Sequence, residues 1–304
     1  MLWFLIINLA YFLNAISTII NKFLLTKKVP NPAVFTFFIC FLNLLALILI
    51  PFGFKLYSLE QIAFALITGI IFAFALLYMF KALHHNEASR ITPFMGGLQP
   101  IFIFLLAWFF LSETLNTTLV IAFITMIIGT VILSWHSDEE LTVEAKNSKT
   151  HGYLMALIAT ILFAVMYTMS KYVYLHQDFV SGFVWTRIGA FIGSLILLIK
   201  PQNLKDILGE FKESAQKSGL LFVFGQIAGA LSFVLVNYAI AISDSVAVVN
   251  ALRGIEYVFL LIIVLLLSIK FPKLLEEKMT PKTITQKIVA TAFIIGGLII
   301  IAYA

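Results

Sequence analysis

Ten long apolar runs limit what this chain can fold into. Each run is close to the roughly 20 residues that a helix needs to cross the ~30 Å hydrocarbon core of a bilayer. The runs are continuous and do not alternate at every second residue, so they predict membrane-spanning helices and not the strands of a membrane barrel. They cover residues 2–24, 32–53, 60–82, 89–111, 116–135, 151–172, 179–199, 218–242, 245–269 and 285–303.

The composition agrees with this pattern. Apolar residues make up 62% of the 304 residues and charged residues only 12%, against about 25% charged in a soluble domain. The single cysteine, Cys40, excludes a disulfide scaffold and a cysteine-based zinc site. The net charge of +5 comes from residues in short loops, which is not the pattern of a nucleic-acid-binding surface. We therefore expect an all-α polytopic protein of the lipid bilayer, without a cofactor or metal.

Lysine and arginine predict the orientation. Sixteen of the 20 lie in the connections opposite the chain ends, two (Lys55 and Lys171) lie on the same side as the ends, and two lie inside runs. Because basic loops stay in the cytoplasm, the count places both termini outside, in a protein expected in a bacterial inner membrane.

The ten runs divide into two similar halves. The polar stretch 136–150 is the predicted cytoplasmic linker between residues 1–135 and residues 151–304. Asn21-Lys22 ends the first run as Ser170-Lys171 ends the sixth, and Gly129 falls where Gly296 does. Five spans in each half require the second half to enter the membrane upside down. Such inverted repeats place a substrate site near the membrane midplane.

Several short motifs in the first half resemble those of a known family. They are Tyr78–Leu83, Glu87-Ala88-Ser89, Thr92-Pro93-Phe94, Leu98-Gln99-Pro100, Phe109–Glu113 and Gly129. In this order the sequence resembles the EamA-type transporters of the drug/metabolite transporter superfamily, over essentially the whole chain. The second half departs from the pattern near Glu256-Tyr257 and in the basic segment 270–280.

The resemblance implies a ten-helix secondary transporter that works by alternating access and often exports its substrate. Amino acids, sugars, nucleotide-linked metabolites and drugs are all substrates in that superfamily, so the fold does not name one. Many relatives keep both termini in the cytoplasm, which disagrees with the lysine count.

Three ionisable residues inside the runs are the first candidates for the substrate site. Arg187 lies in the seventh run, and Arg253 and Glu256 lie three residues apart in the ninth. Ionisable groups in a membrane usually face the bundle interior and mark function. A guanidinium suits a carboxylate or phosphate, which favours an anionic or zwitterionic substrate. Glu256 is also the candidate for proton coupling. The alternatives are a self-neutralising Arg253–Glu256 pair and an interhelical tie through Arg187.

Uncharged polar and aromatic residues in the runs form a second group. The predicted substrate-binding residues of this group are Gln99, Tyr78, Trp185, Gln226, Asn250 and Tyr257. Interhelical hydrogen bonding or ordinary packing is the alternative for each of them.

Four further residues are candidate gate or hinge residues. Pro93 and Pro100 lie in the fourth run, where each frees a backbone carbonyl one turn back and allows a bend. Lys22 and Lys171 end matching runs. Their ammonium groups are expected to reach the lipid headgroups, and a gate role is the alternative.

Four other segments have a structural interpretation. His84-His85 is read as an interfacial pair and not as a metal site, because no third ligand is near in sequence. Gly189–Gly193 and Gly225–Gly229 are small-residue faces expected to bring the two halves, or two protomers, into close contact. Residues 200–217 have the spacing of a short amphipathic helix on the membrane surface.

Other functional classes fit less well. The chain has none of the common hydrolase, metalloprotease or nucleotide-binding motifs, and its loops are too short for a catalytic domain, so it is not predicted to be an enzyme. No filter-like repeat indicates a channel. A flippase for lipids or lipid-linked metabolites and a multidrug exporter remain alternatives. Without a P-loop, uphill transport would use a proton gradient or a counter-substrate, in a monomer or homodimer.

Overall fold

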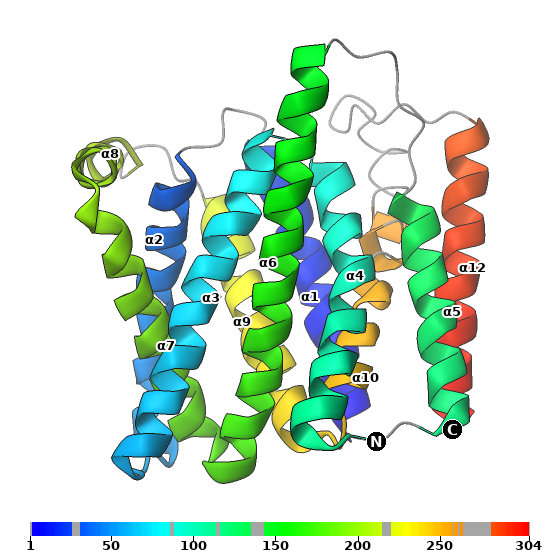
Figure 1. The fold of residues 1–304 in the computed structure, drawn as a ribbon, viewed down its shortest axis with the longest axis horizontal. Helices are drawn as coiled ribbons and strands as arrows, with labels where there is room; N and C mark the ends of the chain where they lie inside the picture. Colours follow the sequence, from blue (N-terminus) through cyan, green and yellow to red (C-terminus); the bar gives the residue numbers. More distant parts are fainter. Residues whose placement is uncertain are drawn as a thin grey trace.

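The computed structural model describes residues 2–25, 31–85, 88–113, 116–134, 143–214, 220–256, 258–260, 262–263 and 281–303, all in helices or short connections with no strand among them (Figure 1). The first half contains α1 (Leu2–Leu25), α2 (Pro32–Leu42), the 3₁₀ helix η1 (Asn43–Phe52), α3 (Leu59–His85), α4 (Ala88–Leu111) and α5 (Thr117–Ser134). The second half contains α6 (Val143–His176), α7 (Phe179–Leu195), the 3₁₀ helix η2 (Ile196–Ile199), α8 (Pro201–Ser214), α9 (Leu220–Ile242), α10 (Val246–Ala251) and α12 (Pro281–Tyr303).

The predicted all-helical class is confirmed for the described part of the chain. Six helical segments are long and apolar enough to cross a membrane, namely Leu2–Ile20, Pro32–Phe52, Leu59–His85, Phe94–Leu111, Thr150–His176 and Phe179–Ile199. Shorter apolar helices occupy Thr117–Gly129, Ile227–Ile242 and Ile288–Gly297. Every one of the ten predicted runs contains described helix, while the number of membrane crossings stays a prediction.

The helices stand side by side, and both chain ends lie at one end of the bundle (Figure 1). We call this end the terminal face and the other end the opposite face. The α2–α3, α4–α5, α6–α7 and α9–α10 connections lie at the terminal face. The α8 helix lies at the opposite face, where it is seen end-on and so runs across the other helices.

Local sequence signals set several helix ends. Asn31 begins α2 by accepting a hydrogen bond from the Ala33 N–H at 3.0 Å, with Pro32 at the first helical position. Ser112 ends α4 in the left-handed region, at φ +54°. Ser245 begins α10 by accepting a hydrogen bond from the Val248 N–H at 3.2 Å. These polar caps divide the apolar runs into the observed helices.

The predicted helices differ from the structure in two places. Helix α6 begins at Val143, so it includes part of the stretch predicted as a linker. The predicted run 245–269 is interrupted after α10, because residues 252 and 253 form a turn. Helix α4, by contrast, continues through both Pro93 and Pro100, as the predicted run 89–111 requires. The hinge role of the two prolines stays a prediction.

The two halves pack on each other through close helix pairs. The most extensive contacts are α3 with α6, α1 with α9, α5 with α12 and α3 with α7. A Cβ atom added at Gly189 of α7 would lie 2.1 Å from the Leu66 carbonyl oxygen of α3, so the two backbones touch. A Cβ atom at Gly225 of α9 would lie 2.6 Å from Ile20 of α1. The prediction that these glycine motifs join the two halves is confirmed.

The predicted amphipathic segment forms α8. Ile207 is buried at 4% exposure, whereas Leu208 is 59% exposed. Asn31, the residue that begins α2, donates a hydrogen bond to the Asp206 carboxylate at 2.8 Å. Asn203 donates another to the Leu197 carbonyl at 2.8 Å. The helix is thus fixed to the ends of α2 and η2 at the opposite face.

Candidate functional site

The helix of the ninth run is interrupted beside its charged residues. In a continuous helix the Arg253 N–H would donate to the Val249 carbonyl; here it donates to Asn250, at 3.1 Å. The Val249 carbonyl instead accepts a hydrogen bond of 3.0 Å from the Tyr11 hydroxyl of α1. An interrupted helix in a membrane is tolerated where other protein groups satisfy the freed backbone. Tyr11 does so from the opposite half of the chain.

Arg253 and Glu256 belong to a polar network that joins the halves. The Arg253 Nη1 atom donates to Gln99 Oε1 of α4 at 2.8 Å, and its Nε atom lies 3.9 Å from Glu256 Oε2. The Thr18 hydroxyl of α1 donates to Glu256 Oε1 at 3.3 Å, and the Asn14 side chain also bonds this carboxylate. Glu256 is 3% exposed. Sequence reasoning found both charges and Gln99, and the structure brings all three together.

Arg187 lies apart from this network in an aromatic surrounding. Its guanidinium carbon lies 4.6–5.1 Å from the ring centroids of Phe72 of α3, Phe183 of α7 and Phe233 of α9. The residue is 1% exposed. All three guanidinium nitrogens are buried without a hydrogen-bond partner among the described residues. The ring faces stabilise the positive charge by cation–π attraction but satisfy none of its N–H donors.

Polar groups from two more helices complete the surroundings of Arg187. Cys40 of α2 and Tyr167 and Tyr174 of α6 lie near its guanidinium. The Tyr174 hydroxyl in turn donates to the Asn237 amide oxygen of α9 at 3.0 Å. Arg187 therefore lies where helices of both halves meet. Its donors can bind a carboxylate, a phosphate or sugar hydroxyl groups.

Lys171 does not reach toward lipid headgroups, contrary to our first expectation. It is 4% exposed, and its ammonium group donates to the Ile240 carbonyl at 3.1 Å and to the Ser243 carbonyl at the end of α9. Cations stabilise the carboxyl end of a helix in this way. Lys171 therefore fixes the α9–α10 connection to α6.

Glu113, just after α4, fixes the other side of the same connection. Its carboxylate accepts a hydrogen bond of 2.7 Å from the Ser245 hydroxyl and one of 2.9 Å from the Val246 N–H. Because the first turn of a helix has free N–H donors, a carboxylate at this position is favourable. Glu113 thus ties the first half to the beginning of the interrupted helix.

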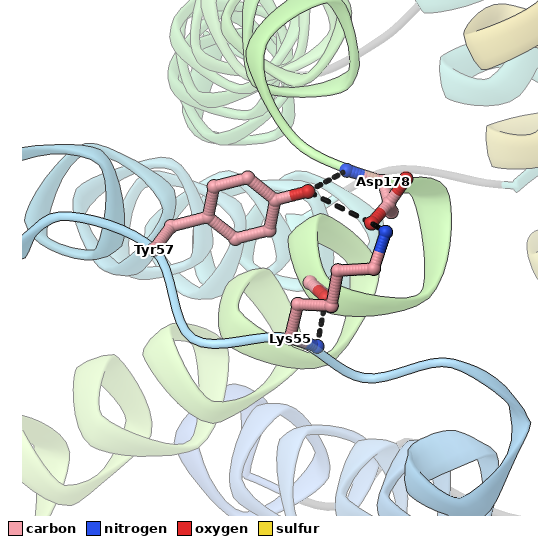
Figure 2. Close-up of polar contacts among 4 residues, drawn as sticks. Lys55, Tyr57 and Asp178 are labelled. Atoms are coloured by element: carbon pink, nitrogen blue, oxygen red, sulfur yellow. Dashed lines mark hydrogen bonds and ion pairs between the residues drawn. The ribbon is translucent and has the colours of Figure 1, made fainter.

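A second tie joins the halves at the terminal face (Figure 2). The Lys55 ammonium lies 2.8 Å from the Asp178 carboxylate, and the Tyr57 hydroxyl donates to that carboxylate at 2.8 Å. The Lys55 N–H donates to the Ser181 hydroxyl at 2.8 Å. The hydrogen bonds from Lys55 and Tyr57 lower the pKa of Asp178, and the same carboxylate raises the pKa of Lys55. We call Lys55, Tyr57 and Asp178 the latch.

The remaining predicted site residues have less distinctive positions. Asn250 donates to Val246 of its own helix at 3.0 Å. Trp185 is half-buried beside Phe54, and its ring N–H has no partner among the described atoms. Tyr78 is half-buried and carries the Lys81 ammonium 5.0 Å from its ring centroid. Pro100 is buried.

Four predicted site positions lie outside what the structure describes. Tyr257 lies outside the described residues, as do the side chains of Gln226, Pro93 and Lys22. Nothing tests their predicted roles. The described part of the chain contains no cluster of three metal-ligating side chains.

Sequence reasoning missed several residues that complete these groups. The rings around Arg187 could not be selected among 30 phenylalanines. Glu113 appeared only in the Phe109–Glu113 motif of the family resemblance, which carried no signal of its role as a helix cap. No sequence pattern indicated that Asp178, at a helix start, contacts Lys55 of the first half.

The apolar helices are those of a polytopic membrane protein, and the family of the chain makes it a transport protein and not an enzyme. The chain belongs to the sugar transport protein family, whose shared sequence pattern matches residues 16–304.

Two relatives come from strains of Bacillus cereus, and each is named a probable glucose uptake protein. One is 25% identical over 60% of this chain and 66% of its own length, so this chain spans about two thirds of that relative. The other is 24% identical over 80% of this chain and 79% of its own length. A solved crystal structure shares the fold with a TM-score of 0.64 and 17% identity, over 97% of this chain and 94% of that one. Membership of the EamA type itself stays a prediction.

Proposed function

We propose that this protein is a secondary-active transporter of a small polar metabolite, in which two inverted repeats alternate access to a central site. The single observation that carries the substrate site is Arg187, a fully buried guanidinium without hydrogen-bond partners among the described residues, where helices of both halves meet. A buried donor without a partner is unfavourable unless a ligand satisfies it for part of the working cycle.

The α5–α12 contact supports the inverted repeat. A Cβ atom at Gly129 of α5 would meet Ala290 and Ile294 of α12, and one at Gly297 of α12 would meet Ala122 and Met126 of α5. The second-half positions 290, 294 and 297 have the same spacing as the first-half positions 122, 126 and 129, so each contact residue has an equivalent in the other half.

The contact is therefore reciprocal, as expected for an interface across a two-fold axis. This pairing matches Gly129 with Gly297, one residue beyond the Gly296 chosen from the sequence. A Cβ atom at Gly296 would meet nothing within 4 Å.

Other features support alternating access. The α1–α9 contact corresponds to the α6–α3 contact once the halves are exchanged, and both are extensive. The helix interruption at Arg253 resembles the discontinuous helices that transporters place at their substrate and ion sites. A second polar group consists of Gln99, Arg253 and Glu256, whose side chains can bind substrate or a coupling proton.

The substrate that fits best is a small molecule of the sugar class that carries an acidic group. The names of the two relatives favour a sugar and favour uptake, whereas the sequence resemblance favoured export. The buried guanidinium donors of Arg187 favour a carboxylate or phosphate. The proposed location is the bacterial inner membrane, with the lysine-rich opposite face in the cytoplasm.

Uptake into proteoliposomes tests the proposal. The purified protein is reconstituted and given radiolabelled glucose, gluconate or glucuronate, with and without a pH gradient. We expect saturable uptake of a sugar acid that Arg187→Leu abolishes and Arg187→Lys partly keeps, because a lysine supplies charge without the planar donors. Equal uptake of glucose by the wild type and by Arg187→Leu would exclude the role of Arg187. Transport of lipids or cationic drugs alone would exclude the proposed substrate class.

A further inference from the structure

The two halves do not contact each other in the same way everywhere. Helix α3 packs against α7 along a seam where a Cβ atom at Gly69 would lie 2.0 Å from the Thr186 carbonyl oxygen. Farther along, Gly193 of α7 faces Ile70 and Ala73 of α3. We call this contact the α3–α7 seam. If the halves are related as inverted repeats, the matching pair is α9 with α2. Among the described residues, α9 and α2 make no comparable contact.

The tight seam is reinforced at the terminal face. The latch connects Lys55 and Tyr57, before α3, to Asp178, before α7 (Figure 2). Next to it, Gln177 donates to the Gln61 carbonyl at 2.8 Å. All these bonds join the first half to the second half. Glu113 adds another such tie at the α9–α10 connection. The described contacts thus close the terminal face.

Arg187 lies beside α2 and α9, the pair without a comparable seam among the described residues. The Phe233 ring of α9 covers one side of its guanidinium, and Cys40 of α2 lies nearby. Arg187 itself lies on α7, between Thr186 and Gly189 of the tight seam. One side of the Arg187 site is therefore backed by packed backbones. The other is bounded by α2 and α9, which can separate without breaking a comparable seam.

We propose that the substrate reaches Arg187 between α2 and α9 from the opposite face, while the α3–α7 seam and the latch keep the terminal face closed. In the other half of the cycle the roles are exchanged: α9 closes on α2, the latch opens and α3 moves away from α7. This inference rests on the proposed transporter with inverted repeats, and it adds which helices separate at each face.

Cys40 provides a natural probe of this route, because the chain has no other cysteine and this one is buried on α2 near Arg187. The probe is a charged, membrane-impermeant methanethiosulfonate reagent, added to membrane vesicles of both orientations. A tag at the C-terminus, detected with an antibody, tells which face carries the termini. A second variant, Thr36→Cys in a Cys40→Ala background, places the thiol one turn nearer the opposite-face end of α2, on the same side of the helix.

We expect the reagent to modify Cys40 about tenfold faster from the opposite face than from the terminal face. This ratio corresponds to a conformation with a closed terminal face that holds about 90% or more of the population. The thiol of the Thr36→Cys variant reacts faster than Cys40 from that face. The double variant Lys55→Ala/Asp178→Ala increases the rate from the terminal face, because its latch is gone. Lys205→Cys in the Cys40→Ala background, at an exposed position of α8, is the control and shows no response to the latch substitutions.

Three results would overturn the inference. They are faster labelling from the terminal face, a latch variant that leaves the terminal-face rate unchanged, and no labelling from the opposite face of either Cys40 or the Thr36→Cys variant. Failure of the transporter proposal has a different signature, since the proteoliposomes would then take up no solute while the face-dependent labelling of Cys40 persisted.

Discussion

Arg253 in the interrupted helix of the second half donates a 2.8 Å hydrogen bond to Gln99 of α4 in the first half. The same guanidinium lies 3.9 Å from Glu256, whose carboxylate accepts a bond from Thr18 of α1. One half-buried cation therefore connects three helices. Its positive charge is balanced within the network, in contrast to that of Arg187.

Replacing Gln99 by leucine is expected to destabilise the protein. Arg253 would lose the hydrogen bond of 2.8 Å to Gln99, and a hydrogen bond to a charged group contributes about 1.5–3 kcal/mol. The midpoint of thermal unfolding of the detergent-solubilised protein measures the change. Gln202→Leu is the matched control, because Gln202 is an exposed residue of α8 that bonds only its neighbour Asp206 among the described contacts. Equal midpoints for the two variants would contradict the role of Gln99.

Two adjacent glycines of α12 should respond in opposite directions to alanine. Gly297→Ala places a methyl group 2.3 Å from Met126 and 2.8 Å from the Ala122 carbonyl oxygen of α5, an overpacking expected to cost about 1–3 kcal/mol. Gly296→Ala meets nothing within 4 Å and should stabilise the helix by about 0.5–1 kcal/mol. Thermal unfolding of the two variants checks the difference in sign. A destabilised Gly296→Ala variant would show that α12 packs differently.

These contacts show where sequence reasoning succeeds and where it ends. Apolar length and small-residue spacing predicted the helices and the close contact at Gly189, because both depend on properties local to one segment. The interruption beside Arg253 was not predicted, and the prolines of α4 lie in a helix that continues past both of them.

The surroundings of a charge were harder to predict than the charge itself. Arg187 and Glu256 stood out because charge is rare in an apolar run. Their partners did not, since Phe72 and Thr18 are far from them in sequence and are common residue types in such helices. The inward turn of Lys171 likewise depends on the position of α9, which no local pattern contains.

Lys171→Met should loosen the α9–α10 connection. The carbonyls of Ile240 and Ser243 would lose the ammonium group that bonds them, at a cost of about 1–3 kcal/mol for unsatisfied buried acceptors. Limited proteolysis at the α9–α10 connection and thermal unfolding measure the effect. Lys205→Met, at an exposed position of α8, is the control and should change stability by less than about 0.5 kcal/mol. Equal stability and equal proteolysis of the two variants would mean that Lys171 does not stabilise the α9–α10 connection.

The latch should be insensitive to pH across the physiological range. The pKa of Asp178 is lowered, so its contribution is present above the usual value near 3.9 and is lost as pH falls through the folded value. The pKa of Lys55 is raised, so its contribution is present below the usual value near 10.4 and is lost as pH rises through the folded value. Between about pH 5 and 9 both groups stay charged.

The rate of Cys40 labelling from the terminal face checks the pH prediction. We expect the ratio between the latch variant and the wild type to stay constant from about pH 5 to about pH 9. A ratio that changes within this range would mean that another titrating group controls the latch. A ratio of one at all pH values would mean that the ion pair does not hold the terminal face.

If the latch does not titrate near neutral pH, a pH dependence of transport must arise elsewhere, and Glu256 is the buried carboxyl of the network that joins the halves. Glu256→Gln keeps an oxygen that can accept the Thr18 hydrogen bond but removes the charge and the exchangeable proton. Uptake by this variant should no longer respond to a pH gradient, while counterflow of unlabelled for labelled substrate continues. Glu256→Gln with unchanged gradient-driven uptake would exclude Glu256 as the proton-coupling residue.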